Sequence, residues 1–372
     1  MQVCLLARKR GQNLHEIPFQ NDVIYLPSES LPAPLKFLVV LIFFVRLCCY
    51  PKKLRAALKS LRRVHGFRQK LQFSFRCFSL YYYQNDLMYF PFGGLAVKYL
   101  EYILETNAHV IISLRGSDIN YFSFVDHSYS QRLKEALLAA DGIHGVCGDI
   151  LERAQELTGS TLGKAGVIFT ALDEDIYKYP TIGFQENSVQ EIISVGRLEW
   201  MKGLEHGMVA ARALIQRGVN FRWRIIGEGE YRLPLEWAIR DMALQDKVFL
   251  AGPMKHQDVM QALLSANIFF HPSISEGVSN AVLEAMALGL PVVACDVGGM
   301  REAIPSDEVG LLVQVRNWKS MADALEKLAR DPGLRARIGA SASVFVRSKF
   351  TAESQAGGFL ALFHRALGEE VA

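Results

Sequence analysis

Two carboxylates eight residues apart are the groups in this sequence best suited to chemistry. Glu276 lies in a loop after an apolar run, and Glu284 lies on the helix expected to follow. A carboxylate in a loop can accept hydrogen bonds from the hydroxyl groups of a sugar, and one on a helix can accept them from a ribose diol. The free backbone N–H groups at the helix start can bind phosphate. A plain N-cap at Ser279 or Asn280 would explain the helix start. It would not explain Glu284, since a carboxylate on a largely apolar helix needs a partner.

Two cations upstream could complete such a site. Arg197 and Lys202 follow an apolar run that ends in Val195 and Gly196. The glycine allows a tight turn after a strand, and cations beside a helix start suit a diphosphate because the helix dipole adds to their attraction. A pair of solvated surface charges is the competing interpretation of these two residues.

Repeated strand–helix units would position these residues in the C-terminal half. They predict a parallel sheet covered on both faces, with ligands at the carboxyl ends of its strands. The expected strands are 191–195, 221–226, 247–250, 268–271, 291–294 and 310–315. The expected helices are 204–217, 232–244, 257–265, 280–288, 300–304, 320–330 and a final helix 351–367.

The N-terminal half follows the same alternation less regularly. A buried strand is expected at 110–114, with further strands at 2–7, 22–26, 86–90, 142–146 and 167–169 and helices at 52–65, 95–105, 131–140 and from 149. A polar linker is expected between residues 171 and 188. We therefore predict two domains and a tail, with bounds 1–175, 176–347 and 348–372.

Ordered motifs in the second half resemble a known family. VGRLEWMKG, IIGEGE, VFLAGPM, HPSISEGVSNAVLEAMALGLPVVACDVGG and GLLV run from Val195 to about Gly310. They resemble the donor domain of retaining glycosyltransferase family 4, in which EGVSNAVLE is the Glu-x7-Glu motif. The resemblance is greatest to members that build bacterial exopolysaccharides and other surface glycans. It implies the GT-B fold, an α/β architecture in which two Rossmann-like domains face a cleft.

The resemblance also implies roles for individual residues. Arg197 and Lys202 would hold the donor diphosphate and stabilise it as it leaves, Glu276 would contact the donor sugar, and Glu284 would bind the ribose. The chain would transfer a hexose from a nucleotide diphosphate sugar to a glycan or lipid-linked acceptor with retention of configuration. No metal and no cofactor are expected. The remaining donor-binding positions are Gly196, Gly252, Pro253, Met254, Gly277, Val278, Ser279 and Asn280.

The N-terminal half departs from the family in two places. VIISLRGSDIN resembles the loop that faces the cleft, so Arg115, Gly116 and Asp118 are candidates for the acceptor side. Arg115 stands where the family often has histidine, and Arg115 and Asp118 could equally form a structural pair. MQVCLLARKRG resembles the second strand of the family, which implies that the first strand–loop–helix unit is absent, through truncation or a reduced acceptor domain.

Charge is distributed unevenly along the chain. No Asp or Glu occurs from Ser30 to Asn85, although this stretch holds eleven of the 41 Lys and Arg residues, leaving 30 basic and 38 acidic residues elsewhere. Such asymmetry indicates an anionic partner. The apolar run FLVVLIFFV is too short for a spanning helix, which needs about 20 residues. It is expected either as a buried helix or strand or, with the basic residues of 35–70, as a contact with an anionic membrane.

Other features limit the class of protein. Six scattered cysteines without a CxxC pair, and an N-terminus without a signal peptide, fit a cytoplasmic protein at the inner face of a membrane. No nucleic-acid-binding motif is present. Two alternatives to a transferase remain: a nucleotide-sugar 2-epimerase-like isomerase, and a catalytically inert GT-B protein that only binds a partner or nucleotide.

Overall fold

The computed structural model describes residues 5–8, 23–26, 31–84, 86–182 and 188–369. Two short strands, β1 (Leu5–Arg8) and β2 (Val23–Leu26), pair in parallel near the N-terminus. Most of the segment 1–11, from which the absence of a first strand–loop–helix unit was predicted, lies outside the described residues, as do Cys4 and residues 183–187 near the end of the expected linker. The described cysteines form no disulfide; they are Cys48, Cys49, Cys77, Cys147 and Cys295.

The C-terminal domain is built on a six-stranded parallel sheet. Its strand order is β9-β8-β7-β10-β11-β12. Counted within the domain this is 3-2-1-4-5-6, the doubly wound order that binds ligands where the order reverses, here between β7 and β10. The strands are β7 (Gln190–Val195), β8 (Phe221–Ile226), β9 (Val248–Gly252), β10 (Ile268–His271), β11 (Val292–Cys295) and β12 (Leu311–Val313).

Helices cover both faces of this sheet, because the strands are apolar on both sides. Trp223 and Phe270 pack under one set of helices, and Phe269 and Val292 under the other. The first set is α9 (Leu204–Gln216), α10 (Arg232–Asp241) and α14 (Trp318–Arg330). The second is α11 (His256–Leu264), α12 (Asn280–Ala287), α13 (Met300–Ala303) and α15 (Pro332–Lys349). The predicted two-sided parallel sheet is confirmed.

The N-terminal domain contains a four-stranded parallel sheet in the order β3-β4-β5-β6. Its strands are β3 (Leu87–Phe90), β4 (His109–Leu114), β5 (Gly142–Gly145) and β6 (Ala165–Val167). One face packs against α4 (Gly93–Lys98), α5 (Leu100–Ile103), α7 (His127–Ala139) and α8 (Gly148–Thr158). The other face is covered by the last helix, α16 (Ala352–Leu367), through Ile111 and Leu362.

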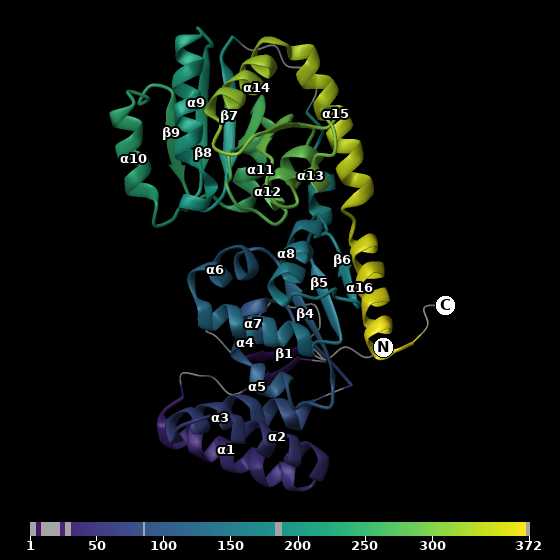
Figure 1. Cartoon of the computed structure of the whole chain (residues 1–372). Coiled ribbons are helices and arrows are strands. Elements are labelled where there is room, and N and C mark those ends of the chain that lie inside the picture. Colours follow the sequence, from purple (N-terminus) through teal and green to yellow (C-terminus); the bar gives the residue numbers. More distant parts are fainter. Residues whose placement is uncertain (1–4, 9–22, 27–30, 85, 183–187, 370–372) are drawn as a thin grey trace.

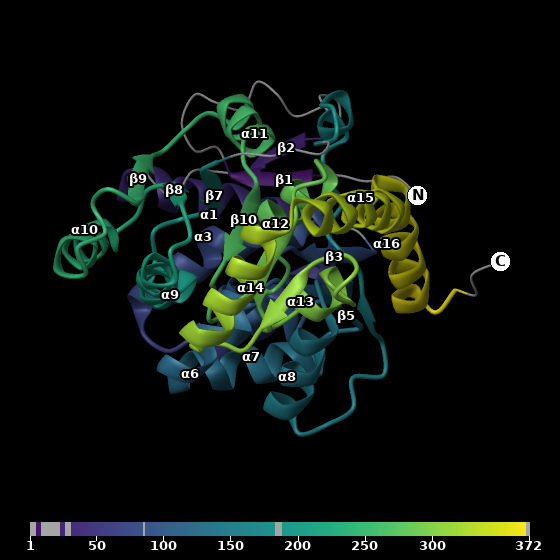
Figure 2. The ribbon, with the colours of Figure 1, turned by 90° about the horizontal axis from the view of Figure 1, so that it is seen from above.

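The chain therefore crosses between the domains twice. It enters the C-terminal domain after the short helix η2 (Glu174–Lys178) and returns through α15 and α16, which run along one side of the molecule in Figure 1. Seen from above, α15 and α16 again lie together at one side (Figure 2). Two parallel-sheet Rossmann-like domains joined in this way constitute the GT-B fold, as predicted.

The helices of the N-terminal half agree with the sequence prediction in one place and differ from it in three. The helix expected at 52–65 is α2 (Pro51–Arg63), and 67–83 forms an unexpected helix, α3 (Phe67–Tyr83). The apolar run is α1 (Ala33–Cys48), but most of its large side chains are exposed, so the interpretation as a buried element was wrong. The single helix expected at 95–105 is divided into α4 and α5 at Tyr99.

Candidate functional site

The carboxylate of Glu276 is the centre of a buried polar cluster at the switch point of the C-terminal sheet. Its Oε1 atom lies 2.5 Å from Nζ of Lys202, 2.9 Å from Nε2 of His271 and 2.9 Å from Oγ of Ser273. The histidine ends β10, and the lysine belongs to the short helix η3 (Trp200–Lys202) between β7 and α9. The doubly wound topology therefore brings together residues separated by 74 positions.

These contacts fix the charge of the cluster. Burial disfavours ionisation of Glu276, but the hydrogen bond and charge of His271 and the charge of Lys202 outweigh it and lower the pKa of Glu276 to about 2. Because an ionised carboxylate only accepts hydrogen bonds, Nε2 of His271 must carry the proton in this contact. All three bonds fall on Oε1, so within the described part of the chain Oε2 of Glu276 keeps its capacity to accept a hydroxyl group.

Arg197 lies near this cluster in sequence but points elsewhere. Its guanidinium pairs with Glu199 at 2.7 Å, and 76% of its side chain is exposed. The structure thus brings Lys202 and Glu276 together without Arg197. An exposed ion pair of this kind contributes little stability, so a bound anion could replace Glu199.

Glu284 projects from the second turn of α12 and has no hydrogen-bond partner among the described residues. Burial raises its pKa; the nearby His256 partly offsets this, and Asp173 adds to it. The preceding helix start also has free capacity, because Ser279 is the N-cap residue of α12 but its side chain makes no capping hydrogen bond. Of the two N-cap candidates, Ser279 holds the N-cap position but makes no side-chain capping bond, so the carboxylate of Glu284 and the backbone donors of the helix start stay available.

Two glycines allow the loops of the cluster to pack closely. Gly203 has a φ of 60°, and a Cβ there would lie 2.2 Å from the carbonyl oxygen of Pro272. At Gly277 a Cβ would lie 2.5 Å from the carbonyl oxygen of Arg115 in the other domain. Any larger residue would push η3 away from the loop after β10, or separate the two domains.

The loop after β4 brings the N-terminal domain to the same place. Asp118 is buried, and its carboxylate accepts hydrogen bonds from the backbone N–H groups of Gly93, Arg115, Gly116 and Ile119. The guanidinium of Arg115 lies 5.1 Å from the centre of the Phe92 ring instead. The suggested structural pair of Arg115 and Asp118 is thus formed through the backbone N–H of Arg115 and not through its guanidinium. Asp118 shapes the loop through such backbone bonds, which leaves it little capacity for an acceptor.

Two hydrogen bonds join the domains at this edge. The side-chain amide of Asn120 donates to the carbonyl oxygen of Glu276 at 3.2 Å, and the backbone N–H of Gly148 donates to Glu302 at 2.7 Å. Gly148 is the first residue of α8, which lies between the domains in Figure 1. The loop that carries Glu276 is thus held from both domains.

Three aromatic side chains lie where the two domains meet beside the Glu276 cluster. Tyr121 lies 5.9 Å from Trp200 and 5.3 Å from Phe122, measured between ring centres. Trp200 precedes Lys202 by two residues, whereas Tyr121 and Phe122 belong to η1 (Asp118–Phe122) of the N-terminal domain. Trp200 and Phe122 are both exposed. Apolar rings facing solvent beside a polar cluster are a feature of ligand sites.

The structure places the remaining predicted donor residues at neighbouring strand ends. Gly252 ends β9, and its carbonyl accepts a hydrogen bond from the N–H of Gly227. Pro253 and Met254 follow it and are exposed. The backbone N–H of Gly299 donates to the carbonyl of Gly277 and so fastens the loop after β11 to the loop of Glu276.

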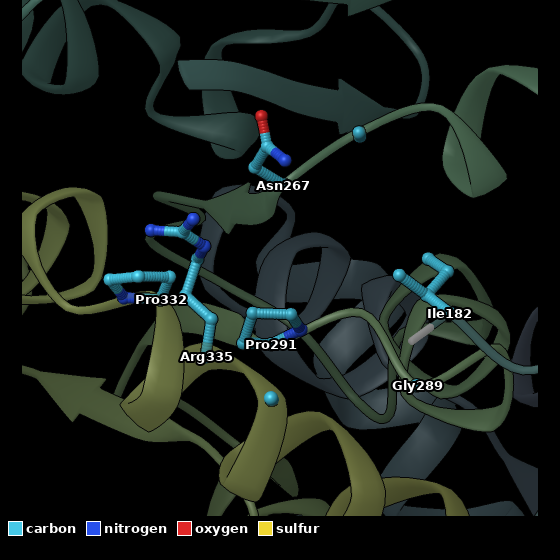
Figure 3. A pocket seen from close by; sticks show the side chains of 8 residues that line it. Ile182, Asn267, Gly289, Pro291, Pro332 and Arg335 are labelled. Atoms are coloured by element: carbon cyan, nitrogen blue, oxygen red, sulfur yellow. The ribbon is translucent and has the colours of Figure 1, made fainter. Parts of the chain in front are cut away.

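A separate hollow lies at the opposite end of the sheet (Figure 3). It is lined by Asn267, which precedes β10, by Pro291, which precedes β11, and by Arg335. The side-chain oxygen of Asn267 accepts a hydrogen bond from the backbone N–H of Glu191. The guanidinium of Arg335 donates hydrogen bonds to the backbone carbonyls of Leu328 and Ala329. These polar groups hold the backbone, and the hollow is not part of the candidate site.

Sequence reasoning missed His271, Ser273, Asn120, Glu302 and the aromatic residues. A histidine at the end of a fully buried strand at the switch point was a usable signal for the first of these. Within the described ranges, no group of three or more His, Cys, Asp or Glu side chains could hold a metal ion. Independence from metals nevertheless stays a prediction.

The part of the candidate site that belongs to the C-terminal domain falls within a stretch that matches a known family. Residues 182–344 match the family described as Glycosyl transferases group 1. The matched residues include Lys202, His271, Glu276, Glu284 and both of the loops that hold Glu276 in the C-terminal domain.

Curated relatives align over a similar part of the chain. Alpha-D-kanosaminyltransferase of Streptomyces kanamyceticus is 33% identical over 48% of this chain and 46% of its own length. The putative colanic acid biosynthesis glycosyltransferase WcaL of Escherichia coli is 37% identical over 36% of this chain and 35% of its own. For the amylovoran biosynthesis glycosyltransferase AmsK of Erwinia amylovora the values are 37%, 37% and 36%. The aligned residues thus span less than half of each relative.

Solved structures match the fold over more of the chain. A glycosyltransferase from Rickettsia africae superimposes with a TM-score of 0.67 at 15% identity, covering 99% of this chain and 91% of that one. HepE of Anabaena, solved with UDP-glucose, superimposes with a TM-score of 0.65 at 19% identity over 75% of this chain and 78% of its own. At these identities the superpositions establish the GT-B fold alone.

Proposed function

We propose that this chain is a glycosyltransferase that moves a hexose from a nucleotide diphosphate sugar to a glycan or lipid-linked acceptor with retention of configuration. The observation that carries the proposal is the Lys202–Glu276–His271 cluster at the sheet switch point, beside the uncapped start of α12. The family match of residues 182–344 and the names of the aligned relatives support the same class.

In this proposal each residue of the site binds a different part of the donor. Lys202 has three N–H donors and gives one to Glu276, which leaves two for diphosphate oxygens. Arg197 exchanges Glu199 for the same phosphates. Oε2 of Glu276 accepts a hydroxyl of the sugar, and Glu284 accepts the ribose hydroxyls. Backbone groups of 277–280 line the sugar and phosphate, while 252–254 and Gly196 border the nucleoside.

The reaction breaks the bond between the anomeric carbon and the diphosphate and forms a bond from that carbon to an acceptor hydroxyl, whose proton is released. The barrier is lowered mainly by cations and helix N–H groups that stabilise the leaving diphosphate, without a metal. The aromatic residues Trp200, Tyr121 and Phe122 stand next to this point and offer apolar ring faces to an acceptor sugar. We place the protein in the cytoplasm, at the inner face of a membrane.

The test is incubation of the full chain with UDP-, GDP- or ADP-hexoses, with and without a bacterial lipid extract as acceptor. We expect release of the nucleoside diphosphate and a glycosylated lipid in the presence of the extract, with the anomeric configuration retained by NMR. Matched Lys202→Met/Glu276→Gln protein should release at most a few per cent as much. Recovery of an epimerised donor without acceptor would establish the isomerase instead, and a donor that binds without turnover would establish the inert alternative.

A further inference from the structure

The helix α1 at the end of the N-terminal domain has an apolar surface that the rest of the described chain does not cover. Val39, Val40, Phe43 and Leu47 pack against the domain. These residues occupy one stripe of the helix at about 3.6 residues per turn. Directly opposite lie Leu38, Leu41 and Val45, which are exposed by 49%, 49% and 59%. The exposed large side chains of α1 also include Leu35, Phe37, Ile42 and Phe44.

A helix that is apolar all round is normally buried in protein or lipid. The two charged side chains of α1 do not interrupt its outward surface, because Lys36 lies over the Phe75 ring and Arg46 over those of Phe43 and Tyr82. An exposed apolar patch of this extent marks an interaction surface. Its partner must itself be apolar over the length of the helix.

Charge identifies the partner. The neighbouring helix α2 packs beside α1 on α3, and in Figure 1 both lie at the end of the molecule away from the C-terminal domain. Arg55 and Arg62 are exposed on α2 with the partly exposed Leu58 between them, and no acidic residue occurs from Ser30 to Asn85. An apolar surface beside cations, in a stretch from Ser30 to Asn85 that holds no acidic residue, is complementary to an anionic lipid bilayer. It is less complementary to a second copy of itself, which would bring like charges together.

The length of α1 determines how it meets the bilayer. Its 16 residues span about 24 Å at 1.5 Å per residue, less than the roughly 30 Å of a hydrocarbon core. None of the described helices is both long and apolar enough to cross a membrane. The helix must therefore lie along the surface.

We propose that α1 docks this chain on anionic membranes by inserting Leu38, Leu41 and Val45 side-on into the headgroup boundary, while Arg55 and Arg62 of α2 contact lipid phosphates. The surface is remote from Glu276 and Lys202, so it does not depend on the proposed transferase activity. It would bring the N-terminal domain, the acceptor side of a GT-B protein, to the lipid phase.

The test is co-sedimentation of the full chain with vesicles of equimolar phosphatidylglycerol and phosphatidylcholine, and with pure phosphatidylcholine. We expect binding to the anionic vesicles that weakens with salt. Leu38→Asp/Val45→Asp should weaken it at least about a hundredfold, since each buried apolar side chain is worth on the order of tenfold. Arg55→Gln/Arg62→Gln should remove most of the preference for anionic vesicles.

The matched control is Leu233→Asp/Val344→Asp, which places the same charges on exposed apolar positions of α10 and α15 and should leave vesicle binding unchanged. Thermal unfolding of each variant reports whether it folds, and donor binding reports the separate site. Vesicle binding unchanged in Leu38→Asp/Val45→Asp would overturn the proposal. The proposal would also be overturned if the wild-type protein bound neither vesicle type and light scattering showed a dimer that Leu38→Asp/Val45→Asp disrupts.

Discussion

Glu276 and Glu284 lie eight residues apart, and their surroundings shift their pKa values in opposite directions. Burial opposes ionisation of Glu276, but His271 and Lys202 outweigh it and lower the pKa of Glu276, whereas burial raises the pKa of Glu284, whose side chain has no hydrogen-bond partner among the described residues. A carboxylate that is already satisfied serves to position other groups. A carboxylate without such partners is stabilised when a ligand donates a hydrogen bond to it, and this is the role proposed for Glu284 with a ribose diol.

Glu284→Gln should therefore separate binding from stability. The amide avoids the cost of a buried charge, so the unfolding temperature of the free protein should stay the same or rise. Donor binding should weaken about tenfold to a hundredfold, because hydrogen bonds to a charged group contribute about 1.5–3 kcal/mol. Calorimetric titration and thermal unfolding give the two quantities. Equal donor affinity in both proteins would remove Glu284 from the donor site.

Glu276 should make the stability of the fold depend on pH in the acid range. Its pKa is about 2 in the folded chain and about 4.3 when unfolded, so the stability it contributes is present above about pH 4.3 and is lost as the pH falls towards 2. Glu276→Gln should destabilise the protein at pH 7, and its difference from wild type should shrink below pH 4. Thermal unfolding across this range is the measurement. A difference independent of pH would contradict the assigned pKa.

At the scale of elements, the regular half of the chain was the predictable half. Strands such as 268–271 are short apolar runs between polar turns, so their existence and order follow from local pattern. The contact of Lys202 with Glu276 does not, because it depends on how β7 and β10 lie side by side. The helix at 67–83 was missed since its aromatic residues carry weak helix propensity, which tertiary packing overrides.

The candidate site divides in the same way. Lys202, Glu276 and Glu284 were found from type and spacing, whereas the outward orientation of Arg197 and the backbone bonds of Asp118 depend on loop geometry that sequence does not encode locally. The exposed surface of α1 was also not predictable, because an apolar run indicates burial but not what covers it.

The short helix η3 carries both Lys202 of the donor cluster and Trp200 of the aromatic residues. A change at Trp200 should therefore affect binding of the acceptor more than binding of the donor. Trp200→Ala is expected to raise the KM for acceptor roughly tenfold while leaving donor affinity unchanged, since it removes a large apolar contact. The control is Trp237→Ala on α10, which is also an exposed tryptophan but lies outside the site. Equal kinetics of the two variants would exclude Trp200 from the acceptor side.

At the scale of the whole molecule, the GT-B arrangement assigns different tasks to its two ends. The C-terminal sheet holds the donor cluster at its switch point, and the loops at 115–120 and 148 close on it from the N-terminal domain. The far end of that domain carries the apolar and basic surface of α1 and α2. One chain thus joins a proposed soluble donor to a proposed membrane-bound acceptor.

Lys202 and Glu276 form the centre of the proposed binding site for a nucleotide diphosphate sugar. The most direct measurement is calorimetric titration of UDP-, GDP- and ADP-hexoses into wild-type protein and the Lys202→Met/Glu276→Gln variant, in which the charges of the buried pair are removed together so that neither is left unpaired. We predict that one nucleotide class binds wild type and binds the folded variant at least about a hundredfold more weakly. Equal affinity for both proteins, or no binding of any of the three classes to wild type, would contradict it.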